Sequence, residues 1–149
     1  MDNELQFRKF EEADFSEYRR WYQVDDRLNE FLGPMEENDE WLEAVLNPDP
    51  EDETWSAWWI ESGREVLVAV VNISVNEAGC TIAAIATCPE QRGRGFGHAT
   101  LSHLAAKFGR LIVHVEEENS RALEFFADHG FVRLGECDEM ITLEYLEKQ

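Results

Sequence analysis

The chain has 149 residues, so we expect one domain over residues 1–149 with a single sizeable core. Thirteen lysines and arginines against 32 aspartates and glutamates give a net charge of −19. This charge excludes the phosphate-neutralising surface that nucleic-acid binding needs, and it disfavours anionic membranes. It is compatible with a cationic substrate or with a role in solubility alone.

The cysteines and the N-terminus indicate the compartment. Cys80, Cys88 and Cys137 are widely spaced and form neither a disulfide framework nor a metal-binding motif. The acidic N-terminus has no apolar segment typical of a signal peptide, and the longest apolar run, residues 66–71, is too short to cross a bilayer. We therefore expect a cytoplasmic protein with reduced thiols and no metal site.

The first third of the chain predicts one strand followed by two helices. Side chains alternate over residues 5–10, which is typical of a strand. Asp14 with Glu17 three residues later is typical of a helix N-terminus. A second helix is predicted over residues 36–46. The prolines in residues 47–50 determine where it ends.

From residue 54 the hydrophobic period changes to two, which predicts an antiparallel meander of three strands. The pattern then alternates between helix and strand, and two strands close the chain. The predicted elements are strands 54–61, 65–75 and 80–87, helix 95–108, strand 111–115, helix 119–129, and strands 131–135 and 140–145. The third meander strand, the next helix and the strand after it form a β-α-β unit, which implies one parallel pair. The order β-α-α-β-β-β-α-β-α-β-β therefore predicts an α/β fold with a mixed sheet.

The most informative segment is Pro89-Glu90-Gln91-Arg92-Gly93-Arg94-Gly95-Phe96-Gly97-His98, between a strand end and a helix start. Alternating glycines allow a tight turn and close approach of the backbone to a ligand. The N–H groups at the helix start favour an anion, and two arginines add positive charge. The segment predicts a diphosphate cradle, with a purely structural turn as the alternative. It lacks the ending of a Walker loop and the spacing of a dinucleotide fingerprint.

This loop, with Arg92, Gly95 and Gly97 in the pattern [QR]-x-x-G-x-[GA], resembles the pyrophosphate loop of the GNAT N-acetyltransferase superfamily. Residues 119–131 resemble the family's second signature, N-x-x-A-x-x-[FLI]-Y-x-x-x-G-F. The element order matches over nearly the whole chain. The N-terminal run, through Trp21 and Leu32-Gly33, is most similar to the branch of ribosomal-protein N-terminal acetyltransferases.

The resemblance implies a GNAT-like single domain, with a mostly antiparallel central sheet and helices on both faces. It also implies acetyl-CoA as co-substrate and direct transfer of the acetyl group to a primary amine. The loop amides would hold the CoA diphosphate, the strand before the loop would pair with the pantetheine arm and polarise the thioester carbonyl, and an asparagine would bond the pantetheine. His98 either contacts a phosphate or faces solvent. The implied cofactor-binding residues are Ile85, Thr87, Arg92, Gly93, Arg94, Gly95, Phe96, Gly97, His98 and Asn119.

The expected catalytic residues are His114, Glu116 and Phe126. His114 is the candidate base for the attacking amine, with a structural histidine as the alternative reading. Glu116, acting through water, is the alternative base. Phe126 occupies the position of the family's tyrosine, and a phenyl ring cannot protonate the leaving thiolate. The alternative function is therefore a weak or inactive acyl-CoA-binding regulatory module.

The acceptor and the assembly state are left open by the sequence. A protein N-terminus, a polyamine, an aminoglycoside-like antibiotic and a small metabolite all remain candidates for the acceptor. The strongly acidic composition is compatible with a cationic one. A monomer and a homodimer are equally compatible with the residues.

Overall fold

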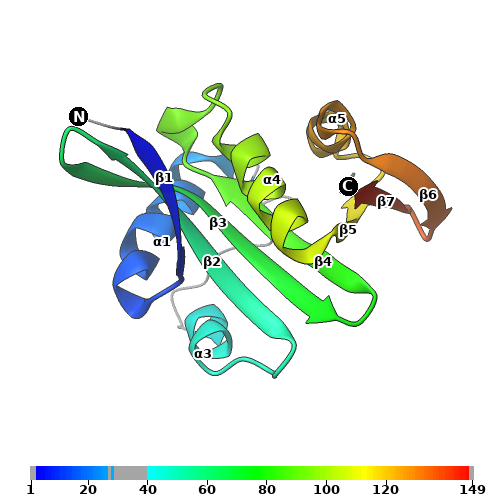
Figure 1. Cartoon of the computed structure of the whole chain (residues 1–149), viewed down its shortest axis with the longest axis horizontal. Helices are drawn as coiled ribbons and strands as arrows, with labels where there is room; N and C mark the ends of the chain where they lie inside the picture. The colour runs from blue at the N-terminus through cyan, green and yellow to red at the C-terminus, as the bar shows by residue number, and fades with distance from the viewer. Residues whose placement is uncertain (1–2, 27, 29–39, 148–149) are drawn as a thin grey trace.

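The computed structural model describes residues 3–26, 28 and 40–147. Its centre is a seven-stranded sheet in the order β1-β2-β3-β4-β5-β7-β6, with helices on both faces (Figure 1). The elements are β1 (Glu4–Lys9), the 3₁₀ turn η1 (Glu12–Asp14), α1 (Phe15–Val24), α3 (Glu40–Leu46), β2 (Asp52–Glu61), β3 (Arg64–Asn76), β4 (Gly79–Thr87), the 3₁₀ turn η2 (Pro89–Gln91), α4 (Phe96–Phe108), β5 (Arg110–Glu116), α5 (Ser120–His129), β6 (Val132–Cys137) and β7 (Met140–Leu146).

The sheet is mixed and mostly antiparallel, which confirms the predicted fold class. Strands β1 to β4 pair antiparallel in chain order, and β7 pairs antiparallel with both β5 and β6. Only β4 and β5 are parallel among the described strands, with α4 as their crossover. The β2–β3 hairpin turns at Ser62 and Gly63, whose φ angles of 51° and 80° match the twist of a two-residue turn.

Each face of the sheet has its own apolar layer. On one face, Leu101 and Leu104 of α4 and Phe126 of α5 pack against a cluster that includes Ile82 and Val113. On the other face, α1 and α3 cover Leu67 and Val70 of β3 with a separate cluster. Because α4 and α5 lie on the same face, they flank β4 and β5 together, and this arrangement positions the site described below.

The boundaries differ from the predicted ones where a helix ends. Phe131 does not begin β6 but lies buried directly after α5. Its amide donates to the Phe126 carbonyl at 3.0 Å, and the amide of Gly130, at φ 111°, donates to the Ala127 carbonyl at 3.0 Å. This pair of bonds closes the helix, so the strand starts one residue later.

Part of the N-terminal prediction lies outside the described residues. Positions 36–39 of the predicted second helix belong to that part, and so do Leu32 and Gly33, which carry the resemblance to the ribosomal-protein branch. The described remainder of the helix is α3. Within the described ranges, no helix is both long and apolar enough to cross a membrane.

Candidate active site

The site is created by the separation of β4 from β5. These strands pair at only three positions, from Cys80–Leu111 to Ile82–Val113, although β4 continues to Thr87 and β5 to Glu116. On the other edge of β4, Asn72 pairs with Ala84 but Ile73 pairs with Ile82. Ala83 is therefore an extra residue in β4, and such a bulge bends the strand. Beyond the bulge, the edge of β4 that faces β5 has backbone groups without a strand partner.

A cleft of about 930 Å³ opens at this separation. Its walls come from β4, β5, the glycine-rich loop and the first turns of α4 and α5, and Asp25 and Leu28 contribute from the segment after α1. The predicted site residues that line it are Ile85, Thr87, Arg92, Gly93, Gly95, Phe96, Gly97, His98, His114, Glu116, Asn119 and Phe126. The tertiary structure thus brings two motifs and the β5 histidine into one cavity.

The loop has the backbone geometry of an anion cradle. Gly93 and Gly95 have φ angles of 84° and 86°, which favour glycine, and an added Cβ at either would meet no atom within 4 Å. The first backbone bond of α4 runs from the Ala99 amide to the Gly95 carbonyl at 2.9 Å, and no described side chain caps this end. The amides of the first turn are therefore available to a bound anion, as a diphosphate requires.

The first turn of α4 lies directly against α5. A Cβ built on Gly97 would approach two ring carbons of Phe125 at 2.9 Å, closer than real contacts allow. The glycine thus permits the two helices that flank the cleft to touch at this point.

The two loop arginines are both engaged by other parts of the protein. The Arg92 guanidinium forms an ion pair with Asp25 and donates to the Thr87 hydroxyl and carbonyl, each at 3.3 Å. The structure differs from the prediction at Arg94, which does not line the cleft. Its guanidinium donates to Gln91 Oε1 at 2.6 Å and lies over the rings of Trp59 and Phe96.

Two ion pairs join α1 to the loop region. Besides the pair between Asp25 and Arg92, Arg20 donates two hydrogen bonds to the Glu90 carboxylate, at 2.7 and 3.0 Å. The hydrogen bonds from Arg20 lower the pKa of Glu90 to about 2. The end of α1 is therefore held beside the glycine-rich loop, although the two are far apart in the sequence.

His98 forms a pair with His129 at the far end of α5. Their Nδ1 atoms are 3.0 Å apart, the ring planes differ by 7° and the ring centroids are 5.2 Å apart. This is the geometry of two nearly coplanar rings joined edge to edge by one N–H···N bond, so one ring donates and the other accepts. Burial, and then the proximity of His98, lowers the pKa of His129. A phosphate contact from His98 would have to use its other ring nitrogen.

The predicted catalytic side chains lie on β5 and α5. His114 and Glu116 are exposed on the part of β5 beyond its pairing with β4, and His114 Nδ1 is 2.9 Å from the Thr142 hydroxyl oxygen. This bond leaves Nε2 of His114 available to a substrate. Phe126 is 3% exposed, and its ring packs 5.1 Å from those of Phe125 and Phe131.

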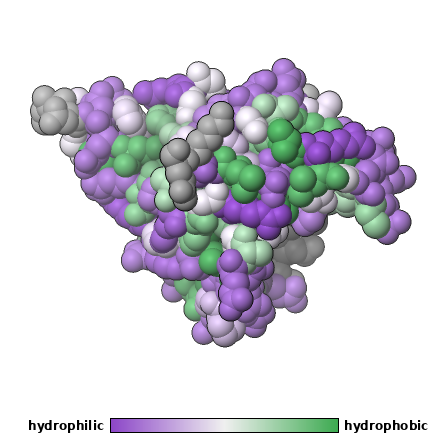
Figure 2. All heavy atoms as spheres, turned by 45° about the vertical axis from the view of Figure 1, so that its right-hand side comes forward, coloured by the Kyte–Doolittle hydropathy of each residue, from purple (hydrophilic) through white to green (hydrophobic). Residues whose placement is uncertain are grey.

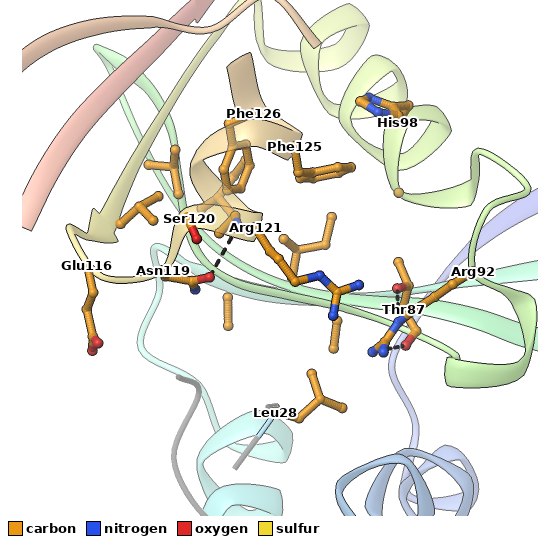
Figure 3. A pocket seen from close by; sticks show the side chains of 18 of the residues that line it. Leu28, Thr87, Arg92, His98, Glu116, Asn119, Ser120, Arg121, Phe125 and Phe126 are labelled. Atoms are coloured by element: carbon orange, nitrogen blue, oxygen red, sulfur yellow. Dashed lines mark hydrogen bonds between the residues drawn. The ribbon is translucent and has the colours of Figure 1, made fainter. Parts of the chain in front are cut away.

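Asn119 is the N-cap of α5. Its Oδ1 accepts the amide of Ala122 at 3.2 Å, so the side-chain NH₂ group remains to donate into the cleft (Figure 3). A pantetheine carbonyl would be a suitable acceptor for it.

The lining residues also include Asp25, Leu28 and Arg121, which the sequence did not indicate as site residues. Arg121 lies inside the second motif, but the sequence indicated only Asn119 and Phe126 there as site residues. Its side chain extends from α5 into the cleft toward Thr87 and Arg92 (Figure 3). No local pattern indicates Asp25, because its role depends on a residue from a distant segment.

Comparison with known proteins assigns the family. The model of the acetyltransferase (GNAT) family matches residues 11–131. No curated protein matches the sequence significantly. The chain resembles a domain from Methanocaldococcus jannaschii (TM-score 0.78, 17% identity, 98% of this chain and 100% of that chain). It also resembles an acetyltransferase from Thermus thermophilus (TM-score 0.77, 19% identity, 96% and 97%).

A third similar structure is the spermidine N-acetyltransferase of Vibrio cholerae in complex with CoA and spermine (TM-score 0.74, 18% identity, 95% of each chain). The similarity to these solved structures shows the fold alone. The assignment to a family rests on the match to the family model. The chain belongs to the GNAT acetyltransferase family, so it is an N-acetyltransferase with acetyl-CoA as its co-substrate. The free amides of the glycine-rich loop fit that co-substrate, because they offer a cradle for its diphosphate.

Proposed function

We propose that the protein transfers an acetyl group from acetyl-CoA directly to a primary amine of a cationic acceptor. One observation carries this proposal: a single cleft contains the anion cradle together with an imidazole and two carboxylates. The imidazole and the carboxylates lie on β5 and the turn after it. His114, Glu116 and Glu118 line the same cavity as the glycine-rich loop. Asp25 adds a third carboxylate from the segment after α1, although Arg92 pairs with it.

In this mechanism His114 Nε2 accepts the proton that the amine loses as its nitrogen attacks the thioester carbonyl carbon. The bond from that carbon to sulfur breaks, and the CoA thiolate leaves. The unpaired edge of β4 near Ile85 and Thr87 supplies backbone amides that stabilise the charge developing on the carbonyl oxygen. Glu116 is the alternative base through one water.

Direct attack is also supported by the state of Cys88. Cys88 directly follows β4 and is only 2% exposed, and its Sγ donates to the Glu90 carboxylate at 3.3 Å. Burial raises the pKa of this thiol. A neutral, buried thiol is a poor nucleophile, so an acetyl-cysteine intermediate is disfavoured.

The acceptor class is tested by an amine screen at two salt concentrations. We expect polyamines and other cationic amines to react with higher kcat/KM than neutral amines of similar shape, because the chain's charge of −19 attracts them. The net charge is thus one reason to propose a cationic acceptor. A second reason is that the structure of the similar V. cholerae enzyme contains spermine. Release of free CoA is the readout. The advantage should shrink near 1 M salt, where the Debye length is about 3 Å.

Equal salt dependence for cationic and neutral acceptors would contradict this acceptor class. It would leave the acidic composition as a feature of solubility alone.

The missing proton donor is tested by Phe126→Tyr. The added hydroxyl lies where the family places its acid, so we expect kcat to rise several-fold. Phe131→Tyr is the matched control, because Phe131 is equally buried beside Phe126 but does not line the cleft. A folded Phe126→Tyr variant with unchanged kcat would show that proton donation to the thiolate does not limit the rate.

A further inference from the structure

The cleft contains few cations for a co-substrate that carries several phosphate charges. Among the described residues that line it, Arg92 and Arg121 are the only lysines or arginines, whereas Asp25, Glu116 and Glu118 are acidic. The chain as a whole carries a charge of −19. Each free cation in the cleft therefore has a large influence on the binding of an anion.

Neither loop arginine is an unpaired cation in the cleft. Arg92 is paired with Asp25 and bonded to Thr87, and Arg94 is bonded to Gln91 outside the cleft. A phosphate would have to displace the Asp25 carboxylate to reach the Arg92 guanidinium. That exchange would break the ion pair between Arg92 and a mostly buried carboxylate, which is unfavourable.

Arg121 has the opposite environment. It is exposed in the first turn of α5 and lines the cleft, and no hydrogen bond or ion pair within the described part of the chain involves its guanidinium. Its side chain extends toward the end of the cleft that holds Thr87 and Arg92 (Figure 3). The free amides of α4 begin at that same loop.

We infer that Arg121 is the side chain that pairs with a phosphate of CoA, while the loop contributes only backbone amides. A guanidinium binds phosphate oxygens through two parallel N–H groups, so it suits this task better than an ammonium group. The Arg92 side chain instead joins the end of α1 to β4. The phosphate can be one of the diphosphate or the 3′-phosphate of the ribose, and the experiment distinguishes them.

The test is calorimetric titration of Arg121→Ala and Arg121→Lys with CoA and with 3′-dephospho-CoA. We expect Arg121→Ala to weaken CoA binding by about 10- to 100-fold, the usual range for a charge-assisted bond, and Arg121→Lys to weaken it less. Arg133→Ala is the control, because it removes the same charge from an exposed arginine that is paired with Glu136 and lies outside the cleft.

The two ligands assign the phosphate. A loss seen with CoA but not with dephospho-CoA identifies the 3′-phosphate, and an equal loss with both identifies the diphosphate. Either result supports the inference if the salt dependence of binding becomes shallower in Arg121→Ala. An unchanged Kd in a folded Arg121→Ala protein would overturn it. So would a weaker Kd with an unchanged salt dependence, which would indicate a structural effect.

Discussion

Replacing Gly95 by glutamate is expected to weaken acetyl-CoA binding by about 100-fold or more. The glutamate would extend from the N-cap of α4, where its carboxylate competes for the free amides and repels the diphosphate. The backbone at φ 86° adds strain of about 1–2 kcal/mol for any residue with a Cβ. Calorimetry with acetyl-CoA measures the loss directly.

Gly109 offers a matched control at the other end of the same helix. Its φ is 80°, and a Cβ there would also meet no atom within 4 Å. The helix has 13 residues, so Gly109 lies about 20 Å from Gly95. Gly109→Glu therefore imposes similar strain and charge without entering the cleft, and we expect nearly normal binding. Gly95→Ala separates the strain from the charge. Unchanged affinity in a folded Gly95→Glu protein would remove the loop from the cofactor site.

Replacing His114 by alanine is expected to lower kcat by about 100-fold while the affinity for acetyl-CoA stays nearly unchanged. The imidazole is exposed in the cleft on β5, whereas the anion cradle belongs to the loop and the first turn of α4. We therefore expect the imidazole to contribute to proton transfer rather than to phosphate binding. Steady-state kinetics as a function of pH check this expectation. Because a general base contributes to the pH dependence of kcat, we expect the pH profiles of the unmodified protein and of the variant to differ.

Three further substitutions define the role of His114. Glutamine cannot take up a proton at neutral pH and should behave like alanine, whereas glutamate should retain part of the rate. Thr142→Val removes the hydroxyl that orients Nδ1, so we expect a smaller fall in kcat with the pH profile retained. Normal turnover and a normal pH profile in a folded His114→Ala protein would contradict the assignment. Glu116 or solvent would then be the base.

We expect the Phe126 position to affect the rate of the reaction rather than the class of enzyme. Membership of the family establishes an N-acetyltransferase, and the structure shows Phe126 buried in the cluster between the sheet and α5. General-acid catalysis typically contributes about 10²–10⁴-fold. A thiolate leaves readily without such help, so the substitution is compatible with an active enzyme.

Much of the fold was predictable because it depends on short-range interactions. Alternating apolar residues determine the strands of the meander, and the turn at Ser62-Gly63 requires positive φ angles that its residues tolerate. The glycines at positions 93 and 95 and the N-cap at Asn119 also act within a few residues. The sequence therefore determines where the loop lies, where both flanking helices begin, and that β4 and β5 are parallel.

The partners of the charged side chains were decided only by the tertiary structure. Arg92 looks like a phosphate ligand in the sequence, but the end of α1 brings Asp25 to it and occupies its guanidinium. Arg121 looks like an ordinary helix residue, but the separation of β4 from β5 opens the cleft beside it. His98 meets His129 because α4 and α5 cover the same face of the sheet. A long charged side chain pairs with the groups that the fold brings within its reach. Periodicity in the sequence carries no information about such long-range contacts.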